Sequence, residues 1–289
     1  MARVEYVEPH SIEEVLSVLD QHGDDAKILA GGQSLLVLMR DRLIEPGLLV
    51  GLQGVPGLDH ITANGDLRIG AMATHTAVQT HPAVRARWPV LAQAEAAVSA
   101  PQIRNRGTLV GNIAHAFPTA DPPAALIALG AQVRIRSSAT ERTLPIEDFF
   151  VSLMQTALTP TELVTEVVVP GQPIGSVGAY MKYAMRPLDF SIVGVGVRLA
   201  LVPDGTCSEA RIGLNGAGAT ALRARRAEAA LWGHRPASDP DAIDAAAELA
   251  AADSDPIADI DGSAEYKRKM VRVFVRRALR QALAALPAT

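Results

Sequence analysis

The sequence predicts an α+β protein with two domains, and three observations support this. Between residues 48 and 73, short apolar segments alternate with turns instead of repeating a strand-helix-strand unit. Residues 178–214 have the pattern of three strands joined by turns, which indicates an antiparallel sheet. Alanine-rich segments with helical patterns follow from residue 221 onward. The 289 residues, 48% of them hydrophobic, are enough for two domains that each bury a core.

The N-terminal elements are predicted from caps and turn residues. Ser11 is a favourable N-cap for a helix over residues 11–22, and Gly23 ends that helix. A short apolar run at residues 27–30 predicts a strand, and residues 34–41 predict the helix that follows it.

The middle of the chain combines a hairpin with a series of helices. Asn64-Gly65-Asp66 is a strong hairpin signal. Residues 74–100 predict helices that begin at the Thr74 cap and restart at Pro82 and Pro89. The remaining expected elements, in chain order, are a helix at 124–129, strands at 131–136 and 162–169, the meander strands at 178–186, 190–202 and 207–214, and helices at 221–233, 240–252 and 263–286.

A stretch rich in proline and glycine, residues 170–178, is the best candidate for a domain boundary. We therefore expect the first domain to cover residues 1–175 and the second to cover residues 176–289.

Composition excludes several kinds of function. The formal net charge of −4 and the pI near 6.0 argue against a nucleic-acid-binding protein, because such domains are generally basic. No apolar stretch is long enough to cross a membrane or to act as a signal peptide, so we expect no integral membrane segment and a cytoplasmic location. The single cysteine, Cys207, excludes a cysteine-ligated iron–sulfur cluster within this chain alone. The seven histidines lack metal-ligand spacing, so we expect no metal site.

The first of two glycine-rich segments, Ala30-Gly31-Gly32-Gln33-Ser34-Leu35, lies between an expected strand and an expected helix. A helix N-terminus presents unpaired backbone amides, and glycine lets a phosphate approach the main chain closely. Lys27 adds a positive charge nearby. The alternative is an ordinary Gly-Gly turn that joins a strand to a helix.

The second segment is a loop candidate, Thr108-Leu109-Val110-Gly111-Asn112-Ile113-Ala114-His115. Thr108 and Asn112 offer a hydroxyl and an amide to a phosphate or a ribityl chain, and Asp121 can accept a hydrogen bond from a sugar hydroxyl. The alternative is a proline-rich surface loop that binds nothing. Two such segments in one chain favour a long anionic cofactor held between two loops.

Together these segments resemble those of the FAD-binding medium subunits of the molybdenum hydroxylases, which include carbon monoxide dehydrogenase and the flavin part of xanthine dehydrogenases. The motifs that carry the resemblance are Ala30–Leu35, Ile69–Thr74, Thr108–Asp121, Tyr180–Arg186, Asp189-Phe190 and Ser263–Tyr266. One position departs, because Val110 stands where the family usually has the first glycine of a Gly-Gly pair. A β-branched residue rarely adopts positive φ, so this turn should either keep a β conformation at Val110 or sit differently around the flavin.

The resemblance implies a first domain of the p-cresol methylhydroxylase (PCMH) or vanillyl-alcohol oxidase (VAO) type, in which two α+β subdomains clasp a noncovalently bound FAD. The second domain would be a three-stranded antiparallel sheet packed on a helical bundle. By the same resemblance, Asp121 would contact the ribityl or ribose region, Val164 would offer main-chain contacts to the adenine or isoalloxazine, and Lys182 would place a positive charge near the flavin. The implied cofactor-binding residues are Lys27, Ile28, Leu29, Ala30, Gly31, Gly32, Gln33, Ser34 and Leu35 for the pyrophosphate, Thr108, Leu109, Val110, Gly111 and Asn112 to complete the clasp, and Asp121, Val164 and Lys182.

The resemblance also implies a role. Substrate would be oxidised at molybdopterin in a large subunit, electrons would cross 2Fe–2S clusters in a small subunit, and the FAD of this chain would pass them to NAD, quinone or oxygen. We expect a dimer of heterotrimers and no catalytic side chain here, because the flavin carries the redox chemistry. Two other interpretations remain: a stand-alone flavin oxidase or dehydrogenase of this fold, and a non-catalytic assembly protein that retains it.

Three further features carry weaker functional interpretations. Residues 216–221 match a loose dinucleotide-binding pattern but lack its βαβ context. His115 is a candidate for covalent flavin attachment, although the family ordinarily binds its flavin noncovalently. The basic residues of the C-terminal helix fit a docking face for a partner or a membrane, or simply the solvated face of a packed helix.

Overall fold

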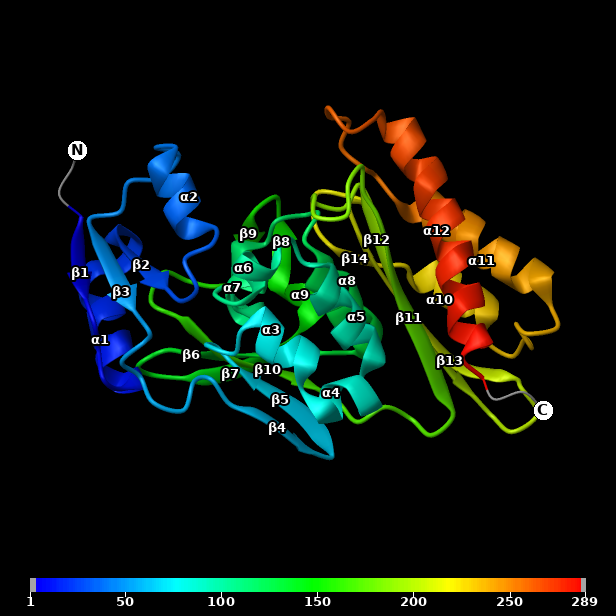
Figure 1. Cartoon of the computed structure of the whole chain (residues 1–289), viewed down its shortest axis with the longest axis horizontal. Helices are drawn as coiled ribbons and strands as arrows, with labels where there is room; N and C mark the ends of the chain where they lie inside the picture. Colours follow the sequence, from blue (N-terminus) through cyan, green and yellow to red (C-terminus); the bar gives the residue numbers. More distant parts are fainter. Residues whose placement is uncertain (1–3, 287–289) are drawn as a thin grey trace.

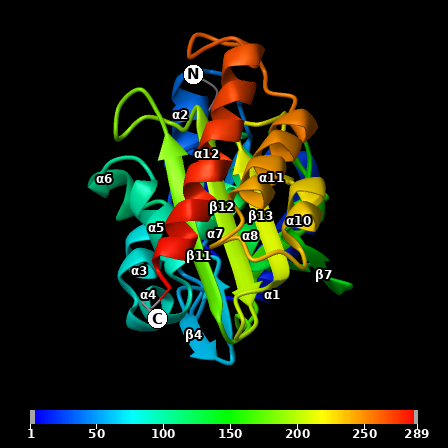
Figure 2. The ribbon, with the colours of Figure 1, turned by 90° about the vertical axis from the view of Figure 1, so that its right-hand side faces the viewer.

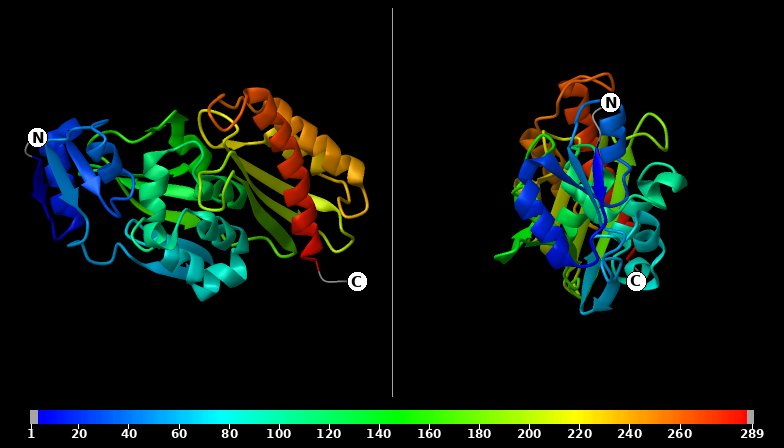
Figure 3. Two further views of the ribbon diagram at one scale, coloured as in Figure 1. Left: turned by 45° about the horizontal axis from the view of Figure 1, so that its top comes forward. Right: turned by 90° about the vertical axis from the view of Figure 1, so that its left-hand side faces the viewer.

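The structure, a computed structural model, describes residues 4–286 as three lobes in a row (Figure 1). The strand β1 (Glu5–Val7) lies in the lobe at one end, and the long helix α12 (Ala264–Ala284) lies in the lobe at the other, as two further views show (Figure 3).

The first lobe is a small parallel sheet with its helices. Its elements are β1, α1 (Ile12–His22), the 3₁₀ helix η1 (Gly23–Asp25), β2 (Ala26–Leu29), α2 (Leu35–Arg40) and β3 (Leu48–Gly51). The strand order is β1-β3-β2. As expected, the side chain of Ser11 caps α1, accepting a hydrogen bond from the amide of Glu14, and Gly23 ends the helix at a φ of 50°.

The second lobe contains a five-stranded antiparallel sheet in the order β4-β5-β10-β6-β7. Its elements are β4 (Ile61–Asn64), β5 (Asp66–Gly70), α3 (His75–Thr80), α4 (Pro82–Arg87), α5 (Pro89–Ala97), α6 (Pro101–Arg104), α7 (Leu109–His115), α8 (Asp121–Leu129), β6 (Gln132–Arg136), β7 (Glu141–Pro145), α9 (Ile146–Phe149), β8 (Phe150–Ser152), β9 (Gln155–Thr156) and β10 (Leu163–Val169). The predicted hairpin turns at Gly65 with a φ of 79°, and Thr74 caps α3.

The third lobe is a sheet in the order β11-β12-β13-β14, with three helices over one of its faces (Figure 2). Its elements are β11 (Ser176–Tyr183), β12 (Val193–Leu201), β13 (Cys207–Asn215), β14 (Leu222–Arg223), α10 (Arg225–Leu231), α11 (Pro240–Asp253) and α12. Val195 and Val197 point from β12 into the core under these helices. The basic face of α12 is partly neutralised by ion pairs to α11, such as Arg276 to Asp244, so this helix is a packed one.

The other face of the third sheet packs on α5 and α8 of the second lobe. Glycine makes this contact close: a Cβ added to Gly196 would lie 2.6 Å from the carbonyl oxygen of Ala124, and one added to Gly213 would lie 2.1 Å from the same atom. Because successive strand residues alternate between faces, Gly178, Tyr180 and Lys182 of β11 also belong to this inner face.

The structure corrects several expectations. The second glycine segment is the helix α7, not a loop, and α8 begins at Asp121 instead of at residue 124. The expected three-stranded meander is present as β11, β12 and β13, and the two-residue strand β14 extends it at one edge. The sequence analysis did not anticipate β1, α6 or the elements from β7 to β9, all of which are short.

Candidate functional site

The first glycine segment lies directly against Arg106 and Gly107, the two residues that lead into the second segment, although the two segments are far apart in the sequence. A Cβ added to Gly31 would lie 2.2 Å from the carbonyl oxygen of Arg106 and 2.7 Å from the Cα of Gly107. No side chain fits in that space, so glycine is required at position 31 for the two segments to meet. Gly32 adds a φ of 72°, a left-handed conformation that glycine adopts without strain.

The first segment presents a row of free backbone amides. Within residues 4–286, the amides from Ala30 to Leu35 donate no hydrogen bond, and all six residues are half-buried. Two carbonyls of the segment are held by side chains: Gln53 Nε2 donates to Ala30 O at 3.0 Å, and Gln33 Nε2 donates to Gly31 O at 3.1 Å. Because these carbonyls are occupied, the groups left to bind a ligand are the backbone amides, which donate hydrogen bonds to an anion.

The second segment is organised differently, as the capped N-terminus of α7. Thr108 Oγ1 accepts a hydrogen bond from the amide of Gly111 at 3.0 Å, and Thr108 is 3% exposed. The cap thus uses one acceptor site of this hydroxyl, whose O–H hydrogen can still donate. Val110 lies in the first turn of the helix, with its side chain buried in the core.

The helical conformation also explains the valine. A helical residue has negative φ, so Val110 is unstrained, and the β conformation considered for it does not apply. The Val110 amide donates no hydrogen bond within the described range, because an amide in the first turn of a helix has no intrahelical acceptor.

Asp121 and Lys182 form a buried ion pair beside α7. Lys182 Nζ lies 2.9 Å from Asp121 Oδ2 and also donates to the carbonyl of Ala97 at 2.9 Å. Tyr180 donates its hydroxyl to the other oxygen, Asp121 Oδ1, at 2.6 Å. Burial raises the pKa of the Asp121 carboxyl to about 6, although Lys182 and Tyr180 both oppose that rise. Burial, together with the Asp121 carboxylate, raises the pKa of Tyr180.

A small pocket of about 50 Å³ joins Asn112 and Asp121. Its other wall includes Leu188 and Phe190, from the loop between β11 and β12. Asn112 Oδ1 is buried and has no hydrogen-bond partner within residues 4–286. A buried carbonyl oxygen without a partner is costly, so the pocket offers a ligand an unused acceptor.

The remaining predicted residues lie on the two flanking sheets. Lys27, Ile28 and Leu29 belong to β2, and the lysine is half-buried, with no ion pair inside the described part of the chain. Val164 lies in β10, where the pairing with β6 shifts register between Val164 and Glu166. Its side chain is buried in the core and the whole residue is 3% exposed, so any contact with a ligand would be through its main chain.

Sequence reasoning missed three supporting groups. Tyr180, which donates to Asp121, was noted only as part of a motif. Gln53 gave no signal, because it lies 23 residues from Ala30, the residue that it contacts. His75 and Glu95 form a buried pair at 2.5 Å under the second segment, and the amide of His75 donates to the carbonyl of Gly107. Spacing in the sequence does not reveal contacts of this range.

Comparisons with known proteins identify the family to which the chain belongs. The sequence profile described as "FAD binding domain in molybdopterin dehydrogenase" matches residues 2–172, and that described as "CO dehydrogenase flavoprotein C-terminal domain" matches residues 178–282. The chain belongs to the FAD-binding medium subunits of the molybdenum hydroxylases. This medium subunit is the FAD-dependent electron-transfer component of a molybdenum-containing dehydrogenase, and its fold is the expected PCMH/VAO-type domain with a C-terminal domain.

Individual relatives match over their whole length. The 6-hydroxypseudooxynicotine dehydrogenase complex subunit alpha of Paenarthrobacter nicotinovorans is 40% identical over 96% of this chain and 94% of its own. The carbon monoxide dehydrogenase medium chain of Hydrogenophaga pseudoflava is 38% identical over 98% of both chains. These names imply that the medium subunit works within a multi-subunit complex.

Solved structures show the same agreement. Carbon monoxide dehydrogenase from Hydrogenophaga pseudoflava matches with a TM-score of 0.94 at 39% identity, covering 98% of each chain. Quinoline 2-oxidoreductase from Pseudomonas putida 86 matches with a TM-score of 0.90 at 35% identity, covering 98% of this chain and 97% of that one. Among the described residues, no helix combines the length and the apolar character needed to span a bilayer.

The residues of the medium subunit fit an FAD. The free amides of Ala30 to Leu35 provide donors for a pyrophosphate, and the glycine contact at position 31 keeps side chains away from them. Asn112 Oδ1 provides an acceptor without a partner, which suits a hydroxyl or a ring N–H of a flavin nucleotide.

Proposed function

We propose that the medium subunit holds FAD noncovalently between the first glycine segment and α7, with the pyrophosphate on the amides of that segment. The row of unpaired amides packed against the second segment is the observation that carries this proposal. Lys27 and the residues 28–35 form one side of the clasp. The α7 N-terminus, residues 108–112, forms the other, mainly through the Val110 amide and the Asn112 side chain.

FAD, when bound, supplies the redox chemistry, and the chain supplies orientation and charge. The Asp121 carboxylate is held by Tyr180 and Lys182, so it presents a fixed, partly neutralised charge beside the pocket. We propose that Lys182 favours negative charge on the flavin through this pair, with a smaller effect than a free ammonium would have. The Asp121 carboxyl lines the pocket beside Asn112. Its pKa of about 6 lets it hold a proton, at Oδ1 or Oδ2, in mildly acidic solution.

The loop between β11 and β12 must move for a flavin ring to contact Asn112 and Asp121. The pocket between them measures about 50 Å³, less than the space of two water molecules at about 30 Å³ each. Leu188 and Phe190 close it from a loop of which residues 185–190 are exposed. We propose that this loop opens to admit the ring and that Val164 contributes main-chain contacts from β10.

The partner subunits complete the electron path in this proposal. A small subunit would carry 2Fe–2S clusters and a large subunit would carry molybdopterin, assembled as a dimer of heterotrimers. Cys207 is buried, and one cysteine cannot ligate a cluster, so the metal centres belong to other chains. Within this chain, residues 1–175 would form the flavin-binding domain and residues 176–289 the second domain.

Purification from cells that also make the partner chains tests the proposal. We expect a yellow complex with one FAD per medium subunit, together with molybdenum and iron in two further chains, and substrate-dependent reduction of an external acceptor. A flavin-containing chain that oxidises an organic substrate by itself would instead make it a stand-alone oxidase or dehydrogenase. A colourless chain that takes up no FAD would make it an assembly protein.

A further inference from the structure

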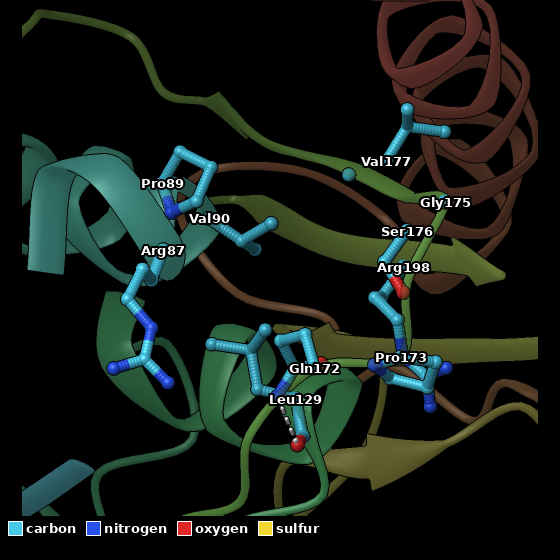
Figure 4. A pocket seen from close by; sticks show the side chains of 11 residues that line it. Arg87, Pro89, Val90, Leu129, Gln172, Pro173, Gly175, Ser176, Val177 and Arg198 are labelled. Atoms are coloured by element: carbon cyan, nitrogen blue, oxygen red, sulfur yellow. Dashed lines mark hydrogen bonds between the residues drawn. The ribbon is translucent and has the colours of Figure 1, made fainter. Parts of the chain in front are cut away.

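A second pocket, of about 230 Å³, lies at the other end of the contact between α5 and β11 (Figure 4). The C-terminal end of α5 meets the ion-paired lysine, since Lys182 donates to Ala97 O. Its N-terminal end borders this pocket at Pro89 and Val90. A helix of this length separates the two ends by roughly 13 Å. The pocket contains none of the residues assigned to FAD.

Arg198 is the buried charged group of this pocket. The exposed Arg87 also lines it, but its guanidinium donates to the carbonyls of Ala63 and Gly65. Arg198 lies on the inner face of β12, between the second and third lobes, and is only 4% exposed. One guanidinium nitrogen, Nη2, pairs with Glu209, while Nε and Nη1 are buried and have no partner within residues 4–286. A buried guanidinium with two unpaired nitrogens is expensive unless something else satisfies it.

Two further orphaned polar atoms line the same pocket. Gln172 Nε2 donates to Pro170 O at 2.6 Å and to Leu129 O at 3.3 Å, which fixes the amide and leaves Oε1 buried without a donor (Figure 4). Ser176 Oγ is also buried and unpartnered among the described residues. The set therefore comprises guanidinium donors, one carbonyl acceptor and one hydroxyl that can act as either.

We propose that this pocket binds a small oxoanion that carries one O–H group, such as hydrogen phosphate or a hydroxy acid. The anionic oxygens match Arg198 and the Ser176 hydroxyl, and the O–H group matches Gln172 Oε1. The volume of about 230 Å³ corresponds to about eight water molecules at about 30 Å³ each, which accommodates such an anion. Gln172 lies in the link between the lobes and donates to Leu129 of the second lobe, whereas Ser176 and Arg198 belong to the third, so the bound anion holds the second and third lobes together.

Titration calorimetry on the purified full chain, with FAD present in excess, tests this site. Inorganic phosphate should bind with a Kd at or below about 1 mM. Sulfate has the same shape but no proton at neutral pH, so it should bind at least about fivefold more weakly, because Gln172 Oε1 then stays unpaired. Glycolate serves as the hydroxy-acid probe. Tighter binding of phosphate points to a phosphate-bearing ligand, and tighter binding of glycolate points to a hydroxy acid.

Two variants and a control locate the binding. Arg198→Met should weaken phosphate binding at least about tenfold and, without phosphate, should leave the unfolding temperature unchanged or raised, because an unpaired buried charge is removed. Ser176→Ala should weaken binding about threefold or more while keeping the fold. Arg226→Met, at an exposed arginine paired with Asp253, is the control and should bind as the parent does. No phosphate or glycolate binding to the parent chain, or equal binding in all variants, overturns the proposal and makes this a pocket filled by water only.

Discussion

The two glycine segments look alike in the sequence, yet they do different work in the structure. The first, at residues 30–35, leaves its amides open and lets side chains hold its carbonyls. The second caps a helix: Thr108 satisfies Gly111, and Val110 fills the core. In the proposed FAD site, the first segment is the binding surface and the second is mainly a support beside it. Substitutions in the first should therefore alter FAD content, and substitutions in the second should alter stability.

Gly31→Val should have the largest effect. A Cβ at this position would lie 2.2 Å from the Arg106 carbonyl oxygen, so the two segments must separate. We expect FAD content in the purified complex to fall at least about tenfold, measured from the absorbance of released flavin. Gly218→Ala is the control, since its Cβ would come no closer than 3.4 Å to a neighbouring atom, an ordinary van der Waals contact. Normal flavin content in Gly31→Val would contradict the proposal that the first segment binds FAD.

Val110→Gly restores the glycine that the family usually has and tests the second segment. It removes a buried side chain and places glycine in a helical turn, so we expect a loss of about 2–3 kcal/mol in the free energy of unfolding. Urea denaturation measures this loss. FAD affinity at low temperature should change less than about twofold, because the backbone amide remains. A large gain in FAD affinity would show that Val110 distorts the clasp.

The pH dependence of stability tests the Asp121 pair beside the second segment. The pKa of this carboxyl is about 6 in the folded chain and 3.8 ordinarily, so the folded chain binds more protons between these values. The contribution of Asp121 to stability is therefore greatest below pH 3.8 and is lost as the pH rises through about 6. Asp121→Asn should remove this decrease in the free energy of unfolding with rising pH, measured by urea denaturation from pH 4.5 to 7. Identical slopes for the variant and the parent would refute the raised pKa.

The smallest expected effects on stability are those of substitutions at Thr108 and Ser34, the N-cap residues of α7 and α2. Thr108→Val removes the cap of α7 and should cost about 1 kcal/mol of stability, seen as a lower unfolding temperature. Ser34 precedes α2 without a capping hydrogen bond, so Ser34→Ala should cost less than about 0.5 kcal/mol. Equal losses would mean that the two segments are not organised differently after all.

Local rules predicted much of the fold. Ser11, Thr74 and the prolines at 82 and 89 begin helices as expected, because caps and proline act through the nearest few residues. The helix α7 was missed because glycine and asparagine in its first turns are weak helix formers, and packing against the core outweighs that preference. The edge strand β14 has two residues, too few for any sequence pattern.

The site could be anticipated only in part. The sequence motifs and family resemblance pointed to both segments and to Asp121 and Lys182, but no local rule links Lys182 to Asp121 across the two lobes. The ion pair changes the expected role of Lys182 from a free charge to a neutralised one. The contact of Gly31 with Arg106 is also a product of the tertiary fold, and it brings the first segment against the residues that precede α7.

A structure of the FAD-loaded complex tests the central claim most directly. We predict pyrophosphate oxygens within hydrogen-bonding distance of the amides between Gly31 and Leu35, with Asn112 Oδ1 engaged by the flavin nucleotide and the loop carrying Leu188 and Phe190 displaced. A pyrophosphate bound elsewhere, with water on those amides, would contradict the account.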